Sequence, residues 1–473
     1  MNNAAHAAPA ANSPVACALS TALDVLRQRF GQQLQQGEAL RTQHAHSTTW
    51  IAPEPPDAVL FAEGEADVRA AVEICATYDV PVIPFGAGTS LEGQVNAARG
   101  GLSIDLSRMN RIIAVNTDDL DCVVEPGVTR KQLNDHLRDL GLFFSVDPGA
   151  EDATLGGMAA TRASGTMAVR YGTMRENVIN LRAVLADGRV ISTARRARKS
   201  SAGYDLTHLF VGSEGTLGVT TELTVRVHGI PEATLAAVCP FETVDGACTV
   251  VIQAIQLGLG LARVELLDEI QVRACNAYSG LAMRETPTLF LEFHGTEQSV
   301  REQVESFRDL ASAEGAGDLE WATETEQRNR LWKARHDAYW AGRALRPGSD
   351  ALATDVCVPI SSLAACVRET REDIDRLGLL APIVGHVGDG NFHVLPLLNM
   401  NDAGERARVE EFVMRLGERA LRFDGTCTGE HGIGTGKKKL LRAEHGEGVD
   451  VMQTIKQALD PNDLFNPGKI FPT

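Results

Sequence analysis

The spacing of apolar residues predicts a chain that mixes helices and strands throughout. Val68, Ala71, Val72 and Cys75 recur at helical spacing, and the apolar run that follows at residues 80–85 predicts a buried strand. From there to the 220s, short runs rich in Val, Ile and Leu are typical of strands. Further strands are predicted at 100–106, 111–117, 120–128, 178–191 and 215–227, with one helix at 129–141.

The pattern changes near residue 232, where strand-like runs begin to alternate with long amphipathic helical stretches. This alternation predicts an α+β module built on an antiparallel sheet. Its strands are predicted at 235–241, 288–295 and 351–360, and its helices at 299–315, 362–378 and 403–423. We therefore divide the chain into a disordered tail, a first domain, a second domain and a C-terminal segment, at residues 1–20, 21–231, 232–425 and 426–473.

Three glycine-rich segments interrupt the first domain. Gly86-Ala87-Gly88-Thr89-Ser90 follows a strand, but Leu91 stands where a Rossmann fingerprint has its third glycine, and no helix is predicted next. The loop is either a plain surface turn or a run of backbone N–H groups able to bind an anion. Two further segments, 147–174 and 212–218, are rich in Gly and Ala and are expected to be irregular. Three such loops in one domain favour an extended dinucleotide ligand.

Two histidines flank a predicted turn in the second domain. Asp389-Gly390 is a hairpin signal between apolar runs, and a hairpin centred there places His386 directly opposite His393. Opposed residues share one face of a sheet with Cβ atoms about 5 Å apart, so the two imidazoles could share a divalent ion. Each histidine alone is more simply interpreted as a core or turn residue.

Composition narrows the function classes. The chain has 473 residues and a formal net charge of −17, which argues against nucleic-acid binding. No apolar run reaches the length of a transmembrane helix, and the first twenty residues hold no Arg or Lys, which argues against a secretory or transit peptide. The nine cysteines form no CxxC pair, so we expect a reducing, cytoplasmic location and no iron–sulfur cluster in this chain.

Several motifs occur together in a familiar order: PVIPFGAGTSLEGQ, ATLGGMAATRASGTMAVRYGTM, FVGSEGTLGV, GHVGDGNFH, CTGEHGIG and LDPNDLFNPGKIF. Over residues 50–470 the chain resembles FAD-dependent D-2-hydroxy-acid dehydrogenases of the vanillyl-alcohol-oxidase type, closest to the D-lactate dehydrogenase (cytochrome) group. The resemblance implies an α+β protein with a two-part FAD-binding domain and a substrate-capping domain that has an antiparallel sheet. The segment 426–473 would return to the FAD domain with the EHG motif.

The resemblance also assigns cofactors and partners. It implies a small 2-hydroxy acid as substrate and a cytochrome, quinone or electron-transfer flavoprotein as acceptor, with location at the inner-membrane surface and a homodimer as further expectations. Some relatives bind flavin covalently through a histidine in the first loop, which this loop lacks, so non-covalent FAD is expected. The cofactor contacts implied are Pro84, Gly86, Ala87, Gly88, Thr89, Ser90, Pro148, Gly149, Thr154, Gly156, Gly157, Gly165, Glu214, Gly218 and Val219.

For the chemistry, the resemblance implies a divalent metal (Zn, Mn or Fe) on His386, His393 and Glu430, with His431 as general base. Arg335 would clamp the substrate carboxylate, and Asn391 is either a substrate- or flavin-orienting residue or a simple turn residue. Relatives acting on D-2-hydroxyglutarate carry a lysine where this chain has no cation, in Ala353-Thr354-Asp355, which favours a monocarboxylate such as D-lactate. The alternatives are a glycolate dehydrogenase flavin subunit, a D-2-hydroxyglutarate dehydrogenase, a flavin-free metal hydrolase and an inactive binding subunit.

Overall fold

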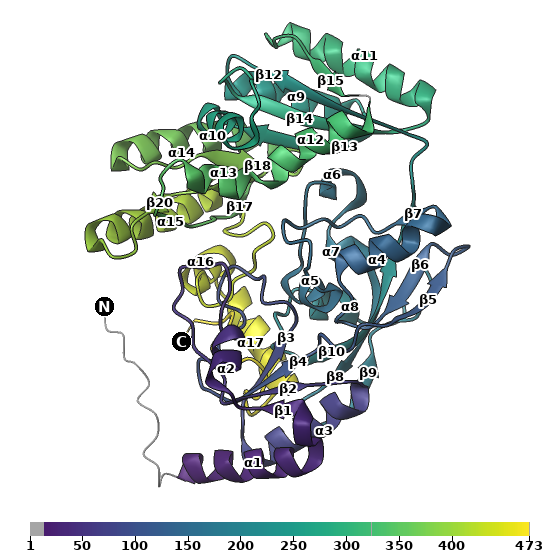
Figure 1. The fold of residues 1–473 in the computed structure, drawn as a ribbon, viewed down its shortest axis with the longest axis vertical. Helices are drawn as coiled ribbons and strands as arrows, with labels where there is room; N and C mark the ends of the chain where they lie inside the picture. Colours follow the sequence, from purple (N-terminus) through teal and green to yellow (C-terminus); the bar gives the residue numbers. More distant parts are fainter. Residues whose placement is uncertain (1–13, 323, 473) are drawn as a thin grey trace.

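The computed structural model describes residues 14–322 and 324–472, which form two units stacked along the long axis of the molecule (Figure 1). The lower unit in this view contains the N-terminal half and also the last helices of the chain. The upper unit contains the segment between them. Of the tail predicted at residues 1–20, the part up to residue 13 lies outside the described residues, and the rest belongs to α1 (Pro14–Phe30).

The lower unit contains two sheets. The first has four strands, in the order β1 (Leu34–Gln35), β2 (Ala58–Phe61), β4 (Leu102–Asp105) and β3 (Val82–Phe85). Strands β2, β4 and β3 are parallel, and β1 at one edge is antiparallel. The helix α3 (Glu65–Tyr78) packs on this sheet through the predicted apolar residues Val68, Ala71, Val72 and Cys75. The second sheet is antiparallel, in the order β5 (Ile112–Asn116), β6 (Asp121–Val124), β10 (Val219–Arg226), β8 (Val178–Val184) and β9 (Val190–Ser192).

Short helices cover the second sheet and share its hydrophobic core. They are α4 (Arg130–Leu137), α5 (Leu155–Thr161), α7 (Met174–Asn177) and α8 (Leu206–Phe210), and α6 (Ala168–Tyr171) lies in the same region. The prediction of an irregular segment at 147–174 is therefore wrong in part. Thr154 starts α5 by accepting a hydrogen bond from the Gly157 N–H at 3.3 Å, a cap that works without any apolar periodicity.

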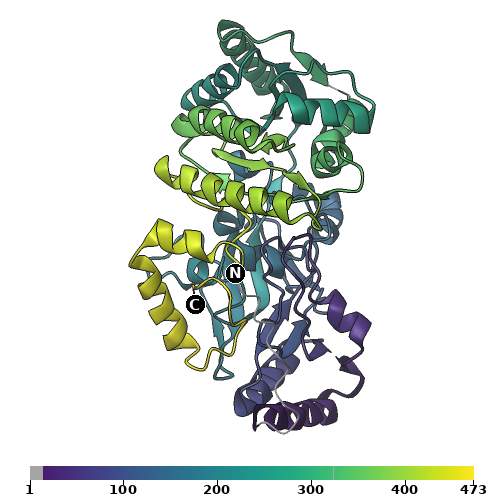
Figure 2. The same cartoon turned by 90° about the vertical axis from the view of Figure 1, so that its left-hand side faces the viewer.

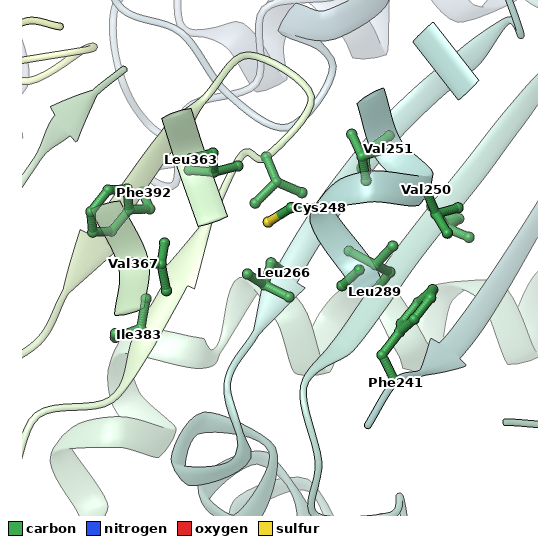
Figure 3. Close-up of a cluster of buried hydrophobic side chains, with 14 of the residues drawn as sticks. Phe241, Cys248, Val250, Val251, Leu266, Leu289, Leu363, Val367, Ile383 and Phe392 are labelled. Carbon is green, nitrogen blue, oxygen red and sulfur yellow. The ribbon is translucent and has the colours of Figure 1, made fainter. Parts of the chain in front are cut away.

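The upper unit is built on a seven-stranded antiparallel sheet buried on both faces. Its strands in order are β15 (Glu320–Ala322), β12 (Ala233–Pro240), β14 (Thr288–Gly295), β13 (Leu261–Leu267), β18 (Ile383–Gly385), β19 (Asn391–Val394) and β17 (Val356–Cys357). Alternate residues of each strand face opposite sides. Thus Leu289 and Leu291 enter one core, shown in Figure 3, whereas Phe290 enters another.

The helices of the upper unit divide between these two faces. The larger core lies under α9 (Val244–Gln256), α11 (Glu297–Ala313), α14 (Leu363–Leu377) and α15 (Ala403–Arg422). The smaller core lies under α10 (Glu269–Ser279), α12 (Thr325–His336) and α13 (Ala338–Ala344). Two short pairs complete the fold, β7 (Leu142–Phe143) with β11 (His228–Gly229) and β16 (Asp350–Ala351) with β20 (Leu397–Leu398).

The C-terminal segment leaves the upper unit and packs against the lower one, as Figure 2 shows in yellow. It contains α16 (Lys438–His445) and α17 (Gly448–Leu459). Beyond α17, the Asn466 N–H donates to the Val82 carbonyl at 2.8 Å, which extends the edge of the first sheet at β3. The predicted α+β architecture, with an antiparallel sheet in the second unit, is confirmed.

The register of the histidine hairpin differs from the prediction. Val384, rather than His386, lies opposite His393, and residues 387–390 form a longer turn in which Gly390 takes a φ of 78°. The shift is two residues, and a shift by an even number leaves every side chain on its predicted face. His386 is therefore a diagonal neighbour of His393, and their ring centroids still lie 5.3 Å apart.

Candidate active site

A cavity of about 580 Å³ lies where the lower unit, the upper unit and the C-terminal segment meet. It is lined by the glycine loops of the lower unit and by the end of α12 and the start of α13 in the upper unit. The C-terminal segment adds Glu430 and His431 between them. Residues that are more than three hundred positions apart in the sequence thus share one enclosed site.

Most of the predicted cofactor residues line this cavity: Pro84, Gly86, Ala87, Gly88, Thr89, Ser90, Pro148, Gly149, Thr154, Gly157, Gly165 and Glu214. Three others, Gly156, Gly218 and Val219, are not among the lining residues, and their contact with the cofactor stays a prediction. Gly156 packs against Pro126, whose Cβ would be 2.6 Å from an added Cβ. Gly218 abuts the Val184 carbonyl, and Val219 is a fully buried residue of β10. These three positions need small or apolar residues for packing.

The wall formed by the first loop suits a ligand that approaches the backbone closely. A Cβ at Gly86 would overlap Oγ1 of Thr154, the residue that caps α5, and Gly88 takes a φ of 68°. Both positions therefore favour glycine for steric reasons. With no side chains in the way, backbone N–H groups here are open to phosphate oxygens, which fits the pyrophosphate of a dinucleotide.

Glu214 lines the cavity but is already engaged by the C-terminal segment. Its two carboxylate oxygens accept hydrogen bonds from the backbone N–H groups of Ile433 and Gly434 at 2.7 and 2.8 Å. Burial raises the pKa of Glu214 to about 7, although both hydrogen bonds act in the opposite direction. Contact of Glu214 with the ribityl or adenine group stays a prediction. Its two hydrogen bonds are to residues 430–434, a segment that contains the EHG motif and is called the EHG loop.

The three expected metal ligands converge at one end of the cavity. Nε2 of His386 and Nε2 of His393 lie 3.3 and 3.2 Å from the same oxygen, Oε1 of Glu430. One candidate ligand atom from each residue lies within 4.8 Å of the other two. Burial opposes ionisation of Glu430, but the two imidazoles outweigh it and hold the pKa of this carboxyl below its usual range.

In both His386 and His393, the hydrogen bond made by Nδ1 decides whether Nε2 is free to bind a metal ion. Nδ1 of His393 lies 2.9 Å from the Thr354 carbonyl, which can only accept, so this nitrogen carries the proton. Nδ1 of His386 lies 2.7 Å from Oε1 of Glu265 and donates in the same way. When a ring is neutral, its Nε2 therefore keeps a lone pair that can bind a cation beside Oε1 of Glu430. This donor set fits a divalent cation, and backing of this kind is typical of metal-ligating histidines.

Arg335 lines the cavity close to this cluster and is joined to it by Glu265. The Arg335 guanidinium donates to Oε2 of Glu265, whose side chain is completely buried. Burial raises the pKa of Glu265, but the charges of Arg335 and His386 outweigh it, and the net pKa is lowered. Glu265 was not among the residues predicted from the sequence. The sequence feature that points to it is a single carboxylate in the middle of the mainly apolar strand LARVELL.

His431 stacks on His393 with centroids 5.2 Å apart and planes 8° from parallel. Burial lowers the pKa of His431 to about 4, assisted by the neighbouring His393 and by the positive charge of Lys437 and opposed by Asp355. The ring is therefore neutral near pH 7 and retains a lone pair that can accept a proton.

Asp355 is a second residue that the sequence analysis did not recognise as important. This buried carboxylate accepts hydrogen bonds from the backbone N–H groups of Glu430 and His431, each at 2.9 Å. It also accepts one from Nδ2 of Asn391 at 2.7 Å. Asn391 is not among the cavity-lining residues and supports the EHG loop through Asp355, and its role in orienting substrate or flavin stays a prediction.

The sequence and the fold of this chain are similar to those of known proteins. Residues 230–470 match the family described as "FAD linked oxidases, C-terminal domain", and residues 56–194 match "FAD binding domain". The fold is that of p-cresol methylhydroxylase, whose substrate-bound crystal structure aligns with a TM-score of 0.80 at 16% identity over 96% of this chain and 97% of the other. The chain belongs to the FAD-linked oxidases, which excludes the flavin-free hydrolase considered from the sequence.

Two relatives within that class are much more similar. The chain is 52% identical to "Probable D-lactate dehydrogenase, mitochondrial" of Danio rerio, over 92% of this chain and 88% of that protein. It is 48% identical to "D-lactate dehydrogenase [cytochrome], mitochondrial" of Arabidopsis thaliana, over 88% of this chain and 74% of that protein. The resemblance inferred from the motifs is therefore confirmed.

Proposed function

We propose that this protein oxidises D-lactate to pyruvate, with non-covalent FAD as the immediate acceptor and a cytochrome, quinone or electron-transfer flavoprotein as the next. The observation that carries the proposal is the meeting of Arg335, His431 and the His386–His393–Glu430 cluster in the cavity lined by the glycine loops. The two relatives named above support the choice of substrate.

Arg335 supplies the group that recognises a 2-hydroxy acid. Its guanidinium lies at the cavity wall with one edge held by Glu265, which fixes its orientation. An arginine held in this way offers its remaining N–H groups to a carboxylate in a planar, bidentate arrangement. The carboxylate of D-lactate is the matching group.

His431 then takes the proton of the substrate hydroxyl. A neutral imidazole at the cavity wall can accept it, and this role typically contributes about 10²- to 10⁴-fold in rate. When bound, FAD supplies a two-electron acceptor for the hydrogen that leaves the α-carbon as hydride. The products are pyruvate, reduced flavin and a proton on His431.

We also propose that His386, His393 and Glu430 hold a divalent metal. Two imidazole nitrogens and a carboxylate suit Zn, Mn or Fe, and the described residues leave the remaining positions to a substrate or water. A cation there supplies positive charge beside the substrate hydroxyl and carboxylate oxygens and favours loss of the hydroxyl proton.

The substrate end of the cavity favours a small monocarboxylate. Ala353 lines the wall where a dicarboxylate-specific relative would need a cation, and Val384 and Leu395 are apolar neighbours in the same lining. A methyl group fits such a surface, whereas a second carboxylate there would be desolvated without a partner. This argues against D-2-hydroxyglutarate as the preferred substrate.

The test is anaerobic reduction of the purified protein, followed by its flavin spectrum. We expect D-lactate to bleach the flavin faster than glycolate or D-2-hydroxyglutarate, and L-lactate to have little effect. The variant R335A should need a higher D-lactate concentration for half-maximal rate, and H431A should keep its flavin but lose most of the rate. Fastest reduction by glycolate or by D-2-hydroxyglutarate would replace D-lactate by one of the two remaining dehydrogenase alternatives. A protein that none of these acids reduces would refute the proposal and favour the inactive binding subunit.

The proposal also covers the cellular compartment and the oligomeric state of the protein. All nine cysteines lie among the described residues and are free thiols, which supports a reducing compartment, for which we propose the cytoplasm beside an inner membrane. No helix in the described part of the chain has the length and apolarity needed to cross a bilayer. A homodimer is proposed on the family resemblance alone, and sedimentation of the FAD-bound protein tests it.

A further inference from the structure

The side of His431 that faces away from the cavity is enclosed. Its Nδ1 is buried and has no hydrogen-bond partner among residues 14–322 and 324–472. An unpaired polar nitrogen in a buried position is costly, so a partner is expected once the site is fully assembled. Oε1 of Glu92 lies 4.0 Å from this nitrogen.

Glu92 is held in place from several directions. Its side chain is buried, and Nζ of Lys437 lies 3.2 Å from Oε1. Lys437 in turn donates to the Asp355 carbonyl at 3.1 Å, which ties it to the residue that supports the EHG loop. Burial raises the pKa of the Glu92 carboxyl to about 6, and Lys437 opposes that rise. The carboxylate is therefore ionised near pH 7.

Residues 92–94 also form hydrogen bonds to the EHG loop and to Thr435 just after it. The Glu92 carbonyl accepts from the Thr435 N–H at 2.8 Å, and the Glu92 N–H donates to Oε1 of Gln94 at 2.9 Å. Nε2 of Gln94 donates to the His431 carbonyl at 2.8 Å. Residues 92–94, which lie just after the first glycine segment, thus fix the position of His431 relative to Glu92.

The chemistry of imidazole gives this arrangement a role. A neutral ring carries one proton, so a base that presents Nε2 to the substrate must carry its proton on Nδ1. That N–H needs an acceptor in a place that water does not reach. Oδ2 of Asp355 is occupied by backbone N–H groups and by Thr428, which leaves the carboxylate of Glu92 as the acceptor on this side.

We infer that Glu92 is a positioning residue for His431: its carboxylate accepts the Nδ1 proton and so turns the Nε2 lone pair toward the substrate. The inference rests on the proposed role of His431 as base. The gap of 4.0 Å closes when ligands fill the cavity, because catalytic hydrogen bonds commonly tighten in the substrate complex. A carboxylate that orients a catalytic imidazole has the same effect in hydrolases.

The variant E92Q tests the inference because it removes the negative charge that Oε1 of Glu92 presents to both Nζ of Lys437 and Nδ1 of His431, at 3.2 and 4.0 Å. The neutral amide oxygen is a weaker acceptor and remains bound to Lys437, so it holds the Nδ1 proton less firmly and orients the imidazole less well. We expect the anaerobic rate of flavin reduction by D-lactate to fall on the order of 10²-fold, the lower end of what a general base contributes. The D-lactate concentration for half-maximal rate and the FAD content should stay unchanged.

The double variant E92Q/H431A separates positioning from general support of the fold. If Glu92 acts through His431, adding E92Q to H431A should change the rate by less than about twofold. E125Q is the matched control, since Glu125 is a buried carboxylate paired with Arg111 away from the cavity. It should leave the rate at the wild-type value.

Each outcome is decisive. A wild-type rate in E92Q, or an equal further loss when E92Q is added to H431A, would overturn the inference while leaving the proposed function intact. Reduction of neither wild type nor variant by any 2-hydroxy acid would instead refute the proposed function, and the inference with it.

Discussion

Oε1 of Glu265 lies 2.7 Å from Nδ1 of His386, while its other oxygen accepts a hydrogen bond from Arg335. One fully buried carboxylate therefore orients both a candidate metal ligand and the candidate substrate clamp. Glu265 lies in β13 with its side chain on the sheet face that carries α10, α12 and α13, since its neighbours Val264 and Leu266 enter the opposite core.

Replacing Glu265 by Gln should weaken metal binding and substrate binding together. The amide can offer only one acceptor atom, so either His386 or Arg335 loses its partner. We expect metal affinity to fall about 10- to 100-fold, as is typical when the residue behind a ligating histidine is changed. Metal content after dialysis and the D-lactate dependence of flavin reduction measure the two effects.

E292Q is the control for this variant. Glu292 lies on the neighbouring strand and also contacts an arginine and a histidine, Arg263 at 3.7 Å and His294 at 2.8 Å, but it does not line the cavity. It should lower thermal stability without changing metal affinity. Equal loss of metal from both variants would show that Glu265 acts only through general stability.

Removing the metal should abolish substrate oxidation and leave the flavin in place. The glycine loops that are expected to bind FAD belong to the lower unit, whereas His386 and His393 belong to the upper unit and Glu430 to the C-terminal segment, so a chelator should yield a yellow protein that D-lactate does not reduce. Added Zn²⁺, Mn²⁺ or Fe²⁺ should restore reduction. H393A should bind no metal, whereas H208A, which changes a half-buried histidine that does not line the cavity, should keep it. Full activity after chelation would refute the metal site.

Substituting Gly86 by Ala should reduce FAD binding. The added Cβ would overlap Oγ1 of Thr154, so either the loop or the start of α5 must move, and both belong to the cavity wall. We expect less flavin per protein after purification and a lower melting temperature. G37A is the control because a Cβ at Gly37 meets nothing within 4 Å. Full FAD occupancy in G86A would show that the loop can shift freely.

His228 should make the fold less stable in mild acid. It lies between Phe143 and Tyr171, and burial, together with the charges of Arg226 and Arg198, lowers its pKa to about 4 from an ordinary value of 6.5. Between pH 6.5 and 4 the unfolded chain binds a proton here that the folded chain does not, so stability falls as pH falls. H228F removes this contribution.

The melting temperature of H228F should therefore rise relative to wild type as the pH is lowered from 7.5 to 5. Other titrating groups are common to both proteins and cancel in the difference. F143L, which disturbs the same aromatic cluster without titrating, should give a difference that does not change with pH. Parallel curves for H228F and wild type would mean that His228 is protonated equally in the folded and unfolded chains.

The histidine hairpin illustrates how far local patterns reach. Alternation of apolar and polar residues places His386 and His393 on one face whichever even register the strands adopt, so the prediction of neighbouring imidazoles is correct although the pairing is shifted. The exact register depended on the turn and on β17, which pairs with the other edge of β19. Neither contact is visible in the hairpin sequence.

By itself, the sequence determined the elements with strong periodicity, the α+β class, the glycine loops, and the residues of the EHG and histidine motifs, because each of these depends on spacing within a short stretch. The tertiary structure decided which charged and polar side chains contact one another. Glu265 joins Arg335 and His386, and Glu92 faces His431, across at least 70 residues of chain in every case. A buried carboxylate takes its role from the partners that offset its desolvation. Those partners come together only in the folded chain, within the upper unit for Glu265 and between the lower unit and the C-terminal segment for Glu92.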